Sequence, residues 1–143
     1  MINIKPVEKG DLIQLMEIKK NVFDNSPSVD EFENCFNEST IKIWKISTQK
    51  IIGFVSFYHV IDEIEIIQIG IIKSYQRKNY GSLIINKIKK LNIKKIFLEV
   101  SVENSQAINF YLKNGFKKIG VRKGYYTRNI YKTDALRLSF EFK

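Results

Sequence analysis

Residues 64–82 read IEIIQIGIIKSYQRKNYGS, and they place a strand, a basic loop and a helix start in direct succession. The first part, Ile64 to Ile72, is rich in isoleucine, and β-branched side chains favour a pleated strand that other elements cover. From Gly81 onward apolar residues recur at helical spacing: Leu83, Ile84, Ile85, Ile88 and Leu91. The segment therefore predicts a buried strand that leads through a polar loop into a helix.

The loop from Lys73 to Tyr80 has the properties of a phosphate site. A helix start leaves unpaired main-chain N–H groups at the positive end of the helix dipole, where an anion is stabilised. Arg77 and Lys78 add positive charge. Asn79 tolerates a left-handed backbone, and Gly81 permits close approach of a ligand. The residues alone leave an ordinary strand–helix turn with solvated lysines equally open.

Residues 76–81, QRKNYG, resemble the Q/R-x-x-G-x-G/A signature of the GNAT acetyltransferases, whose loop binds the pyrophosphate of acetyl-CoA. Asn79 stands where the family usually has glycine. Asparagine is the non-glycine residue that best adopts the same left-handed backbone. The departure therefore weakens the match to the sequence signature, whereas the loop can still take the shape that binds a phosphate.

Length and composition place the chain among single-domain globular proteins. Its 143 residues suffice for one domain, 1–143, and 44% hydrophobic with 27% charged residues is typical of soluble proteins. No apolar run is long enough to span a bilayer, and the start MINIKPVEKGD lacks the apolar core of a signal peptide. We therefore expect a cytoplasmic protein with no membrane partner.

Metal and nucleic-acid chemistry find little support in the residues. The single cysteine, Cys35, excludes an internal disulfide and is expected in the core, and the single histidine, His59, has no partner at a ligand spacing. The net charge of +9 suits an anionic partner, but the lysines are dispersed. The aromatic platforms and arginine-rich runs of nucleic-acid binders are missing. We expect no metal and no direct nucleic-acid contact.

The first forty residues predict a strand and two helices. Residues 1–7 alternate as in a short strand, and Asp11 with Gln14 forms a capping box that opens the first helix. A second capping box opens a short helix over 28–36. The intervening loop, 25–28, is a candidate entrance for an acceptor substrate.

The rest of the chain predicts a meander followed by a crossover. Strands are expected at 41–46, 51–59 and 64–72, joined by tight turns. The helix over 81–91 leads to a strand at 96–100, which should run parallel to the strand before that helix. The remaining expected elements are a helix at 106–114 capped by Asn104 or Ser105, strands at 116–121 and 134–142, and a Tyr-rich basic loop, 122–132, as a candidate binding loop.

Residues 98–100 and 104–116, LEV and NSQAINFYLKNGF, resemble the second half of the GNAT core, and most closely its RimI-type ribosomal-protein-alanine N-acetyltransferases. The basic segment VRKGYY at 121–126 follows, as in those enzymes. The resemblance implies an α/β (α+β) GNAT fold. Its mixed, mostly antiparallel twisted sheet would have about seven strands flanked by about four helices, with a parallel βαβ crossover at the acetyl-CoA site.

The resemblance also implies roles for individual residues. Glu99 would be the general base that deprotonates the acceptor amine, and Tyr111 the general acid that protonates the departing thiolate. Tyr125 and Tyr126 would hold the acceptor. The implied cofactor residues fall into three groups. The main chain of the strand would pair with the pantetheine amides, the loop and helix start would hold the pyrophosphate, and Asn104 would hydrogen-bond the pantetheine arm. In chain order they are Ile69, Gly70, Ile71, Gln76, Arg77, Lys78, Asn79, Tyr80, Gly81, Ser82 and Asn104. Gly70 lies in an apolar strand, where glycine suits a bulge or a close ligand approach.

Several of these residues have a structural alternative. Glu99 could pair with a lysine such as Lys94 instead. Tyr111 could be a core tyrosine on a helix face, and Asn104 a plain helix cap. The acidic turn 62–65 suits either a seat for a basic peptide or an ordinary solvated turn.

The expected function is direct transfer of acetyl from acetyl-CoA to a protein N-terminus in a ternary complex, foremost to the N-terminal alanine of a small-subunit ribosomal protein. An α-amino group, with a pKa of about 7.7–8.0, loses its proton more easily than lysine at about 10.4. Two alternatives stay open. One is acetylation of a small amine (a polyamine or aminoglycoside) or of a lysine side chain, and the other is a non-catalytic CoA-binding or ribosome-associated module. We expect a monomer or weak dimer.

Overall fold

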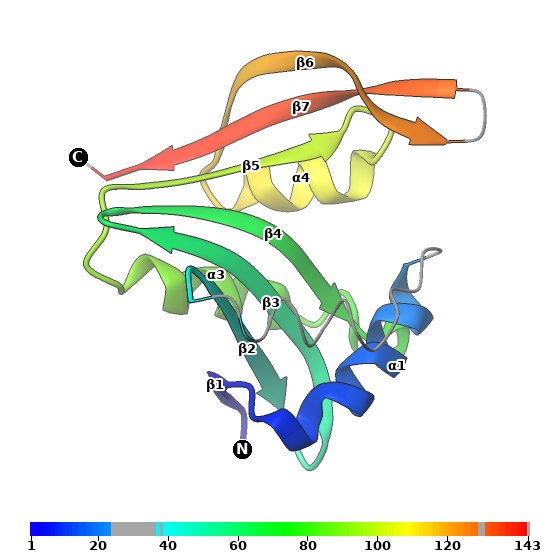
Figure 1. Ribbon diagram of the computed structural model, residues 1–143, viewed down its shortest axis with the longest axis vertical. Coiled ribbons are helices and arrows are strands. Elements are labelled where there is room, and N and C mark those ends of the chain that lie inside the picture. The colour runs from blue at the N-terminus through cyan, green and yellow to red at the C-terminus, as the bar shows by residue number, and fades with distance from the viewer. Residues whose placement is uncertain (24–36, 38, 129–130, 143) are drawn as a thin grey trace.

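The computed structural model describes residues 1–23, 37, 39–128 and 131–142, and of 125–128 and 131–132 it describes the backbone alone. The described residues contain a seven-stranded sheet in the order β1-β2-β3-β4-β5-β7-β6 (Figure 1). Its strands are β1 (Asn3–Pro6), β2 (Ile41–Ser47), β3 (Ile51–Val60), β4 (Glu63–Ile71), β5 (Lys95–Ser101), β6 (Lys117–Arg128) and β7 (Tyr131–Glu141). The helices are α1 (Leu12–Val22), α3 (Tyr80–Lys89) and α4 (Ser105–Lys113), with short 3₁₀ turns at η1 (Lys9–Asp11) and η2 (Lys73–Tyr75).

Helices cover both faces of the sheet, and β3 shows why. Phe54 and Val55 are consecutive buried residues, and their side chains point to opposite faces because side chains alternate along a strand. Phe54 belongs to a cluster with Leu15 of α1. Val55 belongs to the larger cluster with Ile85 of α3 and Tyr111 of α4. The sheet is therefore a central layer with α1 on one side and α3 and α4 on the other (Figure 1).

Only one pair of neighbouring strands in the described sheet is parallel. β4 and β5 are parallel and are connected through α3, whereas every other pairing is antiparallel. A parallel pair needs such a crossover because its strands start at the same end. This confirms the predicted meander, the crossover unit and the mixed, mostly antiparallel sheet.

The start of α1 differs from the predicted capping box. Asp11 makes no side-chain cap of α1. Its Oδ2 instead accepts the main-chain N–H of Glu8 at 2.9 Å, in a capping box one turn earlier over η1. The same oxygen accepts Lys45 Nζ at 2.6 Å. The carboxylate is therefore held toward β2, away from the first N–H groups of α1.

The predicted binding loop 122–132 is wrong in its extent, because it is largely the end of a long hairpin. β6 runs to Arg128 and β7 begins at Tyr131. The register shifts between Arg122 and Tyr126, where Gly124 has φ +62° and donates its N–H to Asp134 Oδ1 at 2.8 Å. A bulge in β6 therefore accommodates residues that were expected to form a loop.

Two predictions fall outside the described residues. These are the helix over 28–36, which contains Cys35, and the candidate acceptor entrance at 25–28. Within the part of the chain that the structure describes, no helix is long and apolar enough to cross a membrane.

Candidate active site

The parallel strands β4 and β5 separate after a short paired stretch. They pair only at Glu63 with Lys95, Ile64 with Ile96, and Glu65 with Phe97, although β4 continues to Ile71 and β5 to Ser101. A bulge lies where they part, since Ser56 and Phe57 of β3 pair with Gln68 and Ile66 and skip Ile67. A bulge bends its strand, so β4 turns away from β5.

The separation leaves a row of main-chain groups on β4 without a strand partner on the β5 side. Ile69, Gly70 and Ile71 lie in this part of β4. The main-chain groups of Gly70 are directed to Phe54 of β3, because Ile72, two residues on, donates its N–H to Ile52 of β3. The groups directed to the β5 side are those of Ile69 and Ile71, and the oxygen of Ile71 accepts Gln76 Nε2. Main-chain N–H and C=O groups require partners, and an extended ligand with amide groups can add to such an edge as another strand would. The opening between β4 and β5 is therefore a site suited to an extended, amide-containing ligand.

Gly70 was expected to suit either a bulge or a close ligand approach, and the bulge is not at this residue. Gly70 pairs regularly with Phe54, and the bulge is at Ile67. A Cβ on Gly70 would lie 2.9 Å from Cε1 of Phe54 and 3.1 Å from Cε2 of Phe23. Glycine is required here because two aromatic rings approach its backbone on the α1 side.

The loop after β4 has two left-handed residues. Asn79 has φ +73°, which confirms that it supplies the backbone shape expected of it, and Arg77 has φ +61°, which the sequence did not indicate. Gln76 Nε2 donates to the main-chain oxygen of Ile71 at 2.8 Å. Gln76 therefore ties the loop back to the end of β4.

Helix α3 begins at Tyr80, directly after this loop. The first main-chain N–H groups of a helix, here those of Tyr80, Gly81 and Ser82, have no partner within the helix and mark its positive end. Arg77 and Lys78 are exposed beside them, and Ser82 is buried. This arrangement suits a pyrophosphate held by main-chain N–H groups with two basic side chains nearby.

Gly81 has a packing role that the sequence did not reveal. A Cβ on this residue would lie 2.9 Å from both Cε1 and Cζ of Phe110 in α4. The expected close approach therefore exists, and the neighbour that the structure shows there is a phenylalanine ring. Gly81 lets α3 and α4 pack closely beside the opening.

Glu99 lies in an ionic environment. Its Oε2 is 3.2 Å from Nη1 of Arg122, and its Oε1 is 3.6 Å from Nε of Arg137. The suggested partner Lys94 instead lies 3.7 Å from Asp62. The side chain of Glu99 is only 14% exposed. Two guanidinium groups therefore hold a mostly buried carboxylate, one for each oxygen.

Glu65 lies on the same face of the sheet as Glu99. It pairs with Phe97, and side chains two residues apart on a strand share a face, so Glu99 is the next residue of β5 on that side. Burial, followed by the charge of Glu99, raises the pKa of the Glu65 carboxyl, while Arg122 and Arg137 lower it. Glu65 is thus half-buried at the opening and is not part of a solvated turn.

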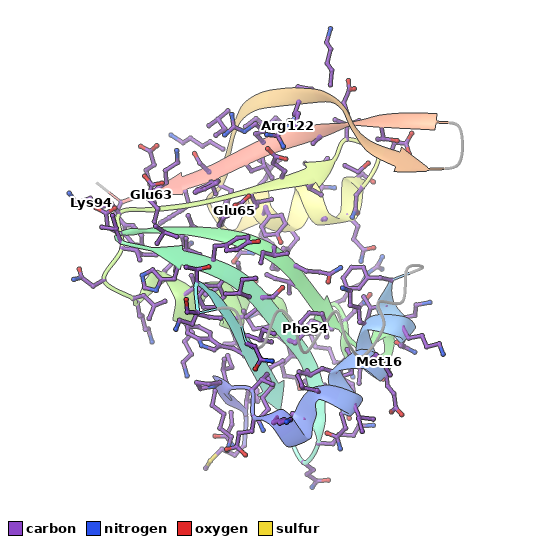
Figure 2. The ribbon with its side chains drawn as sticks, viewed as in Figure 1. Met16, Phe54, Glu63, Glu65, Lys94 and Arg122 are labelled. Carbon is purple, nitrogen blue, oxygen red and sulfur yellow. The ribbon has the colours of Figure 1, made fainter. Side chains whose placement is uncertain are left out.

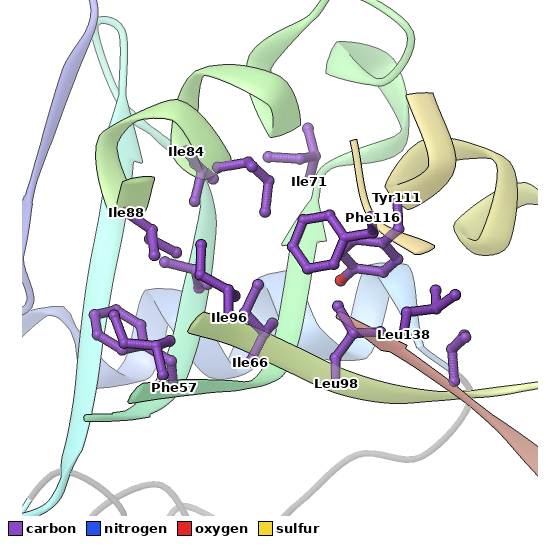
Figure 3. Packing of buried hydrophobic residues seen from close by; sticks show 14 of the residues in the cluster. Phe57, Ile66, Ile71, Ile84, Ile88, Ile96, Leu98, Tyr111, Phe116 and Leu138 are labelled. Carbon is purple, nitrogen blue, oxygen red and sulfur yellow. The ribbon is translucent and has the colours of Figure 1, made fainter. Parts of the chain in front are cut away.

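Tyr111 lies on the other face of the sheet from Glu99. Leu98 and Val100, the neighbours of Glu99, belong to the same buried cluster as Tyr111 (Figure 3). Side-chain alternation therefore directs Glu99 to the opposite side. Tyr111 is 7% exposed, and its ring lies 5.4 Å from that of Phe116. Its position satisfies the core alternative, and its role as an acid stays a prediction.

The remaining predicted residues are placed less directly. Asn104 caps α4, with its Oδ1 accepting the N–H of Ala107 at 3.1 Å, so the cap alternative is confirmed and its contact with a cofactor stays a prediction. Tyr125 and Tyr126 lie in β6, and their side chains are not among those described. Among the described residues there is no group of three or more His, Cys, Asp or Glu side chains that could hold a metal.

Comparison with known proteins identifies the fold and the chemistry. A model of the acetyltransferase (GNAT) family matches residues 11–116. The chain belongs to the GNAT family. The ribosomal protein bS18-alanine N-acetyltransferase of Haemophilus influenzae is 30% identical over 129 residues, which are 87% of this chain and 88% of that protein.

Two solved structures show the same fold. The ribosomal-protein-S18-alanine N-acetyltransferase from Escherichia coli has a TM-score of 0.87 at 23% identity, over 99% of this chain and 94% of that one. The spermidine N-acetyltransferase of Vibrio cholerae, in complex with CoA and spermine, has a TM-score of 0.82 at 24% identity, over 98% and 95%. These findings confirm the predicted family, the fold and the enzyme class of an acetyl-CoA-dependent N-acetyltransferase.

Proposed function

We propose that this GNAT protein acetylates the N-terminal α-amino group of a protein, and that the acceptor is the N-terminal alanine of a small-subunit ribosomal protein. The similarity to the Haemophilus influenzae enzyme, which extends over most of both chains, supports this acceptor. The observation that carries the chemistry is the opening between β4 and β5, with a carboxylate on one face and a tyrosine on the other.

Acetyl-CoA enters this opening with its pantetheine arm along β4. The arm carries amide groups that pair with the main chain of Ile69 and with the N–H of Ile71, as a further strand would, while Gly70 between them pairs with Phe54. The pyrophosphate lies on the main-chain N–H groups at the start of α3, beside Arg77 and Lys78. Gln76 supports this seat indirectly, because it holds the loop to Ile71.

The two sides of the sheet separate the two proton transfers. The acceptor amine approaches from the face of Glu99, which removes a proton directly or through a water molecule. The nitrogen then attacks the thioester carbon and loses its second proton to solvent as the carbon–sulfur bond breaks. The thiolate leaves toward the face of Tyr111, whose hydroxyl supplies its proton and regains one from solvent, while Glu99 releases the proton that it took. In sum, an ammonium ion and acetyl-CoA give an amide, free CoA and one proton released to solvent.

An acceptor panel tests the assignment. The enzyme is incubated with acetyl-CoA and peptides that begin with free alanine, serine or methionine, with an N-blocked peptide that contains lysine, and with spermidine. Mass spectrometry then measures acetylation. We expect the alanine peptide to be acetylated fastest, and acetylation of the blocked peptide or of spermidine alone would contradict the proposal.

Variants of the same enzyme test the residue roles. Glu99→Gln should lower kcat by about 10²–10⁴-fold, as loss of a general base does. Glu103→Gln is the matched control, because Glu103 is exposed just after β5 and should leave kcat unchanged. Tyr111→Phe retains the buried ring, so a loss of kcat with unchanged stability would support its role as the acid.

Acetylation of a small amine is the second candidate function. Glu65 and Glu99 place two carboxylates on the face where the acceptor enters, and paired acids also suit a cationic polyamine. The similarity of fold to the Vibrio cholerae spermidine enzyme is compatible with this acceptor. The spermidine arm of the panel decides between the two.

A further inference from the structure

Arg122 reaches Glu99 from a strand that is not its neighbour. β7 lies between β5 and β6 in the sheet, yet Nη1 of Arg122 is 3.2 Å from Oε2 of Glu99. Its side chain therefore crosses β7. The residue of β7 opposite Arg122 is Ala135, which is fully buried and whose small side chain leaves room for the crossing. Figure 2 labels Arg122 and Glu65, which come from strands on the two sides of the opening.

The two arginines that contact Glu99 are held differently. Arg137 lies directly opposite Glu99 in the regular ladder of β5 and β7. Arg122 lies on an edge strand whose register shifts on both sides of it, between Lys118 and Gly120 and again after Arg122 itself. Its side chain is 54% exposed. The side chain of Arg137 is 46% exposed, so the two arginines differ in the regularity of their strands and not in their exposure. A regular ladder fixes the backbone of Arg137, whereas the backbone of Arg122 lies at an irregular part of the edge.

Among the side chains that the structure describes, the charges that act on Glu65 and Glu99 are balanced before an acceptor arrives. Glu65 and Glu99 contribute two negative charges, and Arg122 and Arg137 contribute two positive charges. An acceptor ammonium group that joined all four would leave one uncompensated positive charge at a half-buried site, which is unfavourable. If the ammonium group replaces one guanidinium, the balance is kept.

We propose that Arg122 occupies, in the free enzyme, the place of the acceptor's ammonium group, and that Glu65 and Glu99 together hold that group once Arg122 has moved aside. The inference rests on the proposed function in that it requires a cationic amine as acceptor. Arg137 stays in place and orients Glu99. Arg122 is then a competitor that every acceptor displaces, and Glu65 is a positioning residue for the amine.

Equilibrium binding of the acceptor tests the role of Arg122. The enzyme is loaded with CoA, which has no acetyl group to transfer, and the alanine peptide is titrated by calorimetry. Arg122→Gln should tighten binding about two- to fivefold, the range that corresponds to release of one exposed ion pair. Lys123→Gln is the matched control, since it removes the same charge from the next residue and should leave Kd unchanged.

A blocked peptide separates the ammonium group from the rest of the acceptor. The N-acetylated form of the same peptide has no ammonium group, so Arg122→Gln should not tighten its binding. Equal Kd values of Arg122→Gln and Lys123→Gln for the free peptide would overturn the inference. Equal tightening for the free and blocked peptides would overturn it too, because the effect would then be general electrostatics.

The role of Glu65 has its own pair of variants. Glu65→Gln should raise the Kd of the free peptide about fivefold, in line with loss of one charge-assisted contact. The affinity for acetyl-CoA should stay unchanged. Glu63→Gln is the control, because Glu63 is exposed two residues earlier on the same face of β4. Equal peptide affinities of these two variants would exclude Glu65 from the seat.

The two proposals can fail separately. If the unaltered enzyme acetylates the alanine peptide while Arg122→Gln has no effect on its binding, the inference is overturned and the proposed function stands. If the enzyme acetylates spermidine and not the alanine peptide, the proposed acceptor is wrong. The same comparison of Arg122→Gln with Lys123→Gln, made with spermidine, then decides the inference.

Discussion

The sheet has two parts that are built alike and joined very differently. β1 to β4 form antiparallel ladders that run along the strands with single bulges, and β5, β7 and β6 form antiparallel ladders with two register shifts in β6. Between the two parts, only residues 63–65 pair with 95–97. Hydrogen bonding within each part therefore supports the fold, whereas its absence between them leaves main-chain groups for a ligand. The site is the place where the sheet does not close.

Apolar packing on the covered face holds the two parts together where pairing stops. Ile64 of β4 and Ile96 of β5 are fully buried partners, and they share a cluster with Ile84, Ile85 and Ile88 of α3. Figure 3 shows Ile96 and Ile88 within this cluster. Helix α3, which begins directly after the loop 73–79, thus also packs on the paired residues of β4 and β5. The same helix therefore contributes to the proposed cofactor site and to the stability of the fold.

The largest effect is expected from breaking this junction. Ile96→Ala removes a fully buried side chain and should lower the free energy of unfolding by about 2–5 kcal/mol. Phe97 is the next residue of β5 and lies half-buried on the opposite face, which carries Glu65 and Glu99. Phe97→Ala should lower the free energy of unfolding by less than Ile96→Ala, although it deletes a larger side chain. Urea unfolding of both variants measures the difference. A larger cost for Phe97→Ala would mean that the open face carries the junction.

A smaller effect is expected from the contact between α3 and α4. In Gly81→Ala the new methyl group would lie 2.9 Å from the ring of Phe110, and overpacking of this kind costs about 1–3 kcal/mol. Phe110→Leu in the same chain should recover part of the loss, because it removes the atoms in conflict. Thermal unfolding of the single and double variants tests this, and a double variant no better than Gly81→Ala alone would rule out the ring as the cause.

The sequence predicted the two parts of the sheet well, because each depends on local patterns. Isoleucine-rich alternation marked the meander, and the spacing of apolar residues marked α3. The crossover followed from the order strand, helix, strand. Asn79 was correctly expected to be left-handed, since few other residues tolerate that backbone.

The contacts that complete the site could not be predicted in the same way. Arg122 meets Glu99 across an intervening strand, next to a bulge that no periodicity reveals. The packing of Gly81 against Phe110 depends on how two helices approach each other. Of the residues that the sequence analysis missed, Arg137 was the easiest to find. Alternation along 134–142 directs its apolar neighbours to one face of the sheet and Arg137 to the other, the face of Glu99.

An ion pair far from the opening sharpens the comparison. Asp11 and Lys45 lie within the first part of the sheet at 2.6 Å, with side chains 18% and 12% exposed. Burial raises the pKa of Asp11, but the hydrogen bonds from Lys45 and the N–H of Glu8 outweigh it and lower the pKa below its usual value. Asp11→Asn should therefore cost about 1–2 kcal/mol near neutral pH and leave acetyl-CoA binding unchanged.

The pH dependence of that cost has a definite sign. A carboxyl whose pKa is lowered by folding stabilises the protein above its unfolded pKa, and this contribution is lost as the pH falls through the folded value. The difference in unfolding free energy between Asp11→Asn and the unaltered chain should therefore shrink below about pH 4. A difference that stayed constant with pH would show that the charge of Asp11 is not its source.

The smallest expected effect has the opposite sign and lies at the junction itself. Folding raises the pKa of Glu65, so its protonated form is favoured, and that contribution is lost as the pH rises through the folded value. Glu65→Gln should therefore be more stable than the unaltered chain at pH 7, by about 0.5 kcal/mol, and the two should converge as the pH falls toward 4. Thermal unfolding across this range measures the difference, with Glu63→Gln expected to follow the unaltered chain throughout.

A variant less stable than the unaltered chain at pH 7 would mean that ionised Glu65 supports the fold. A more stable variant with weaker acceptor binding would instead mean that the charge is kept at the opening for the amine, at the expense of the junction.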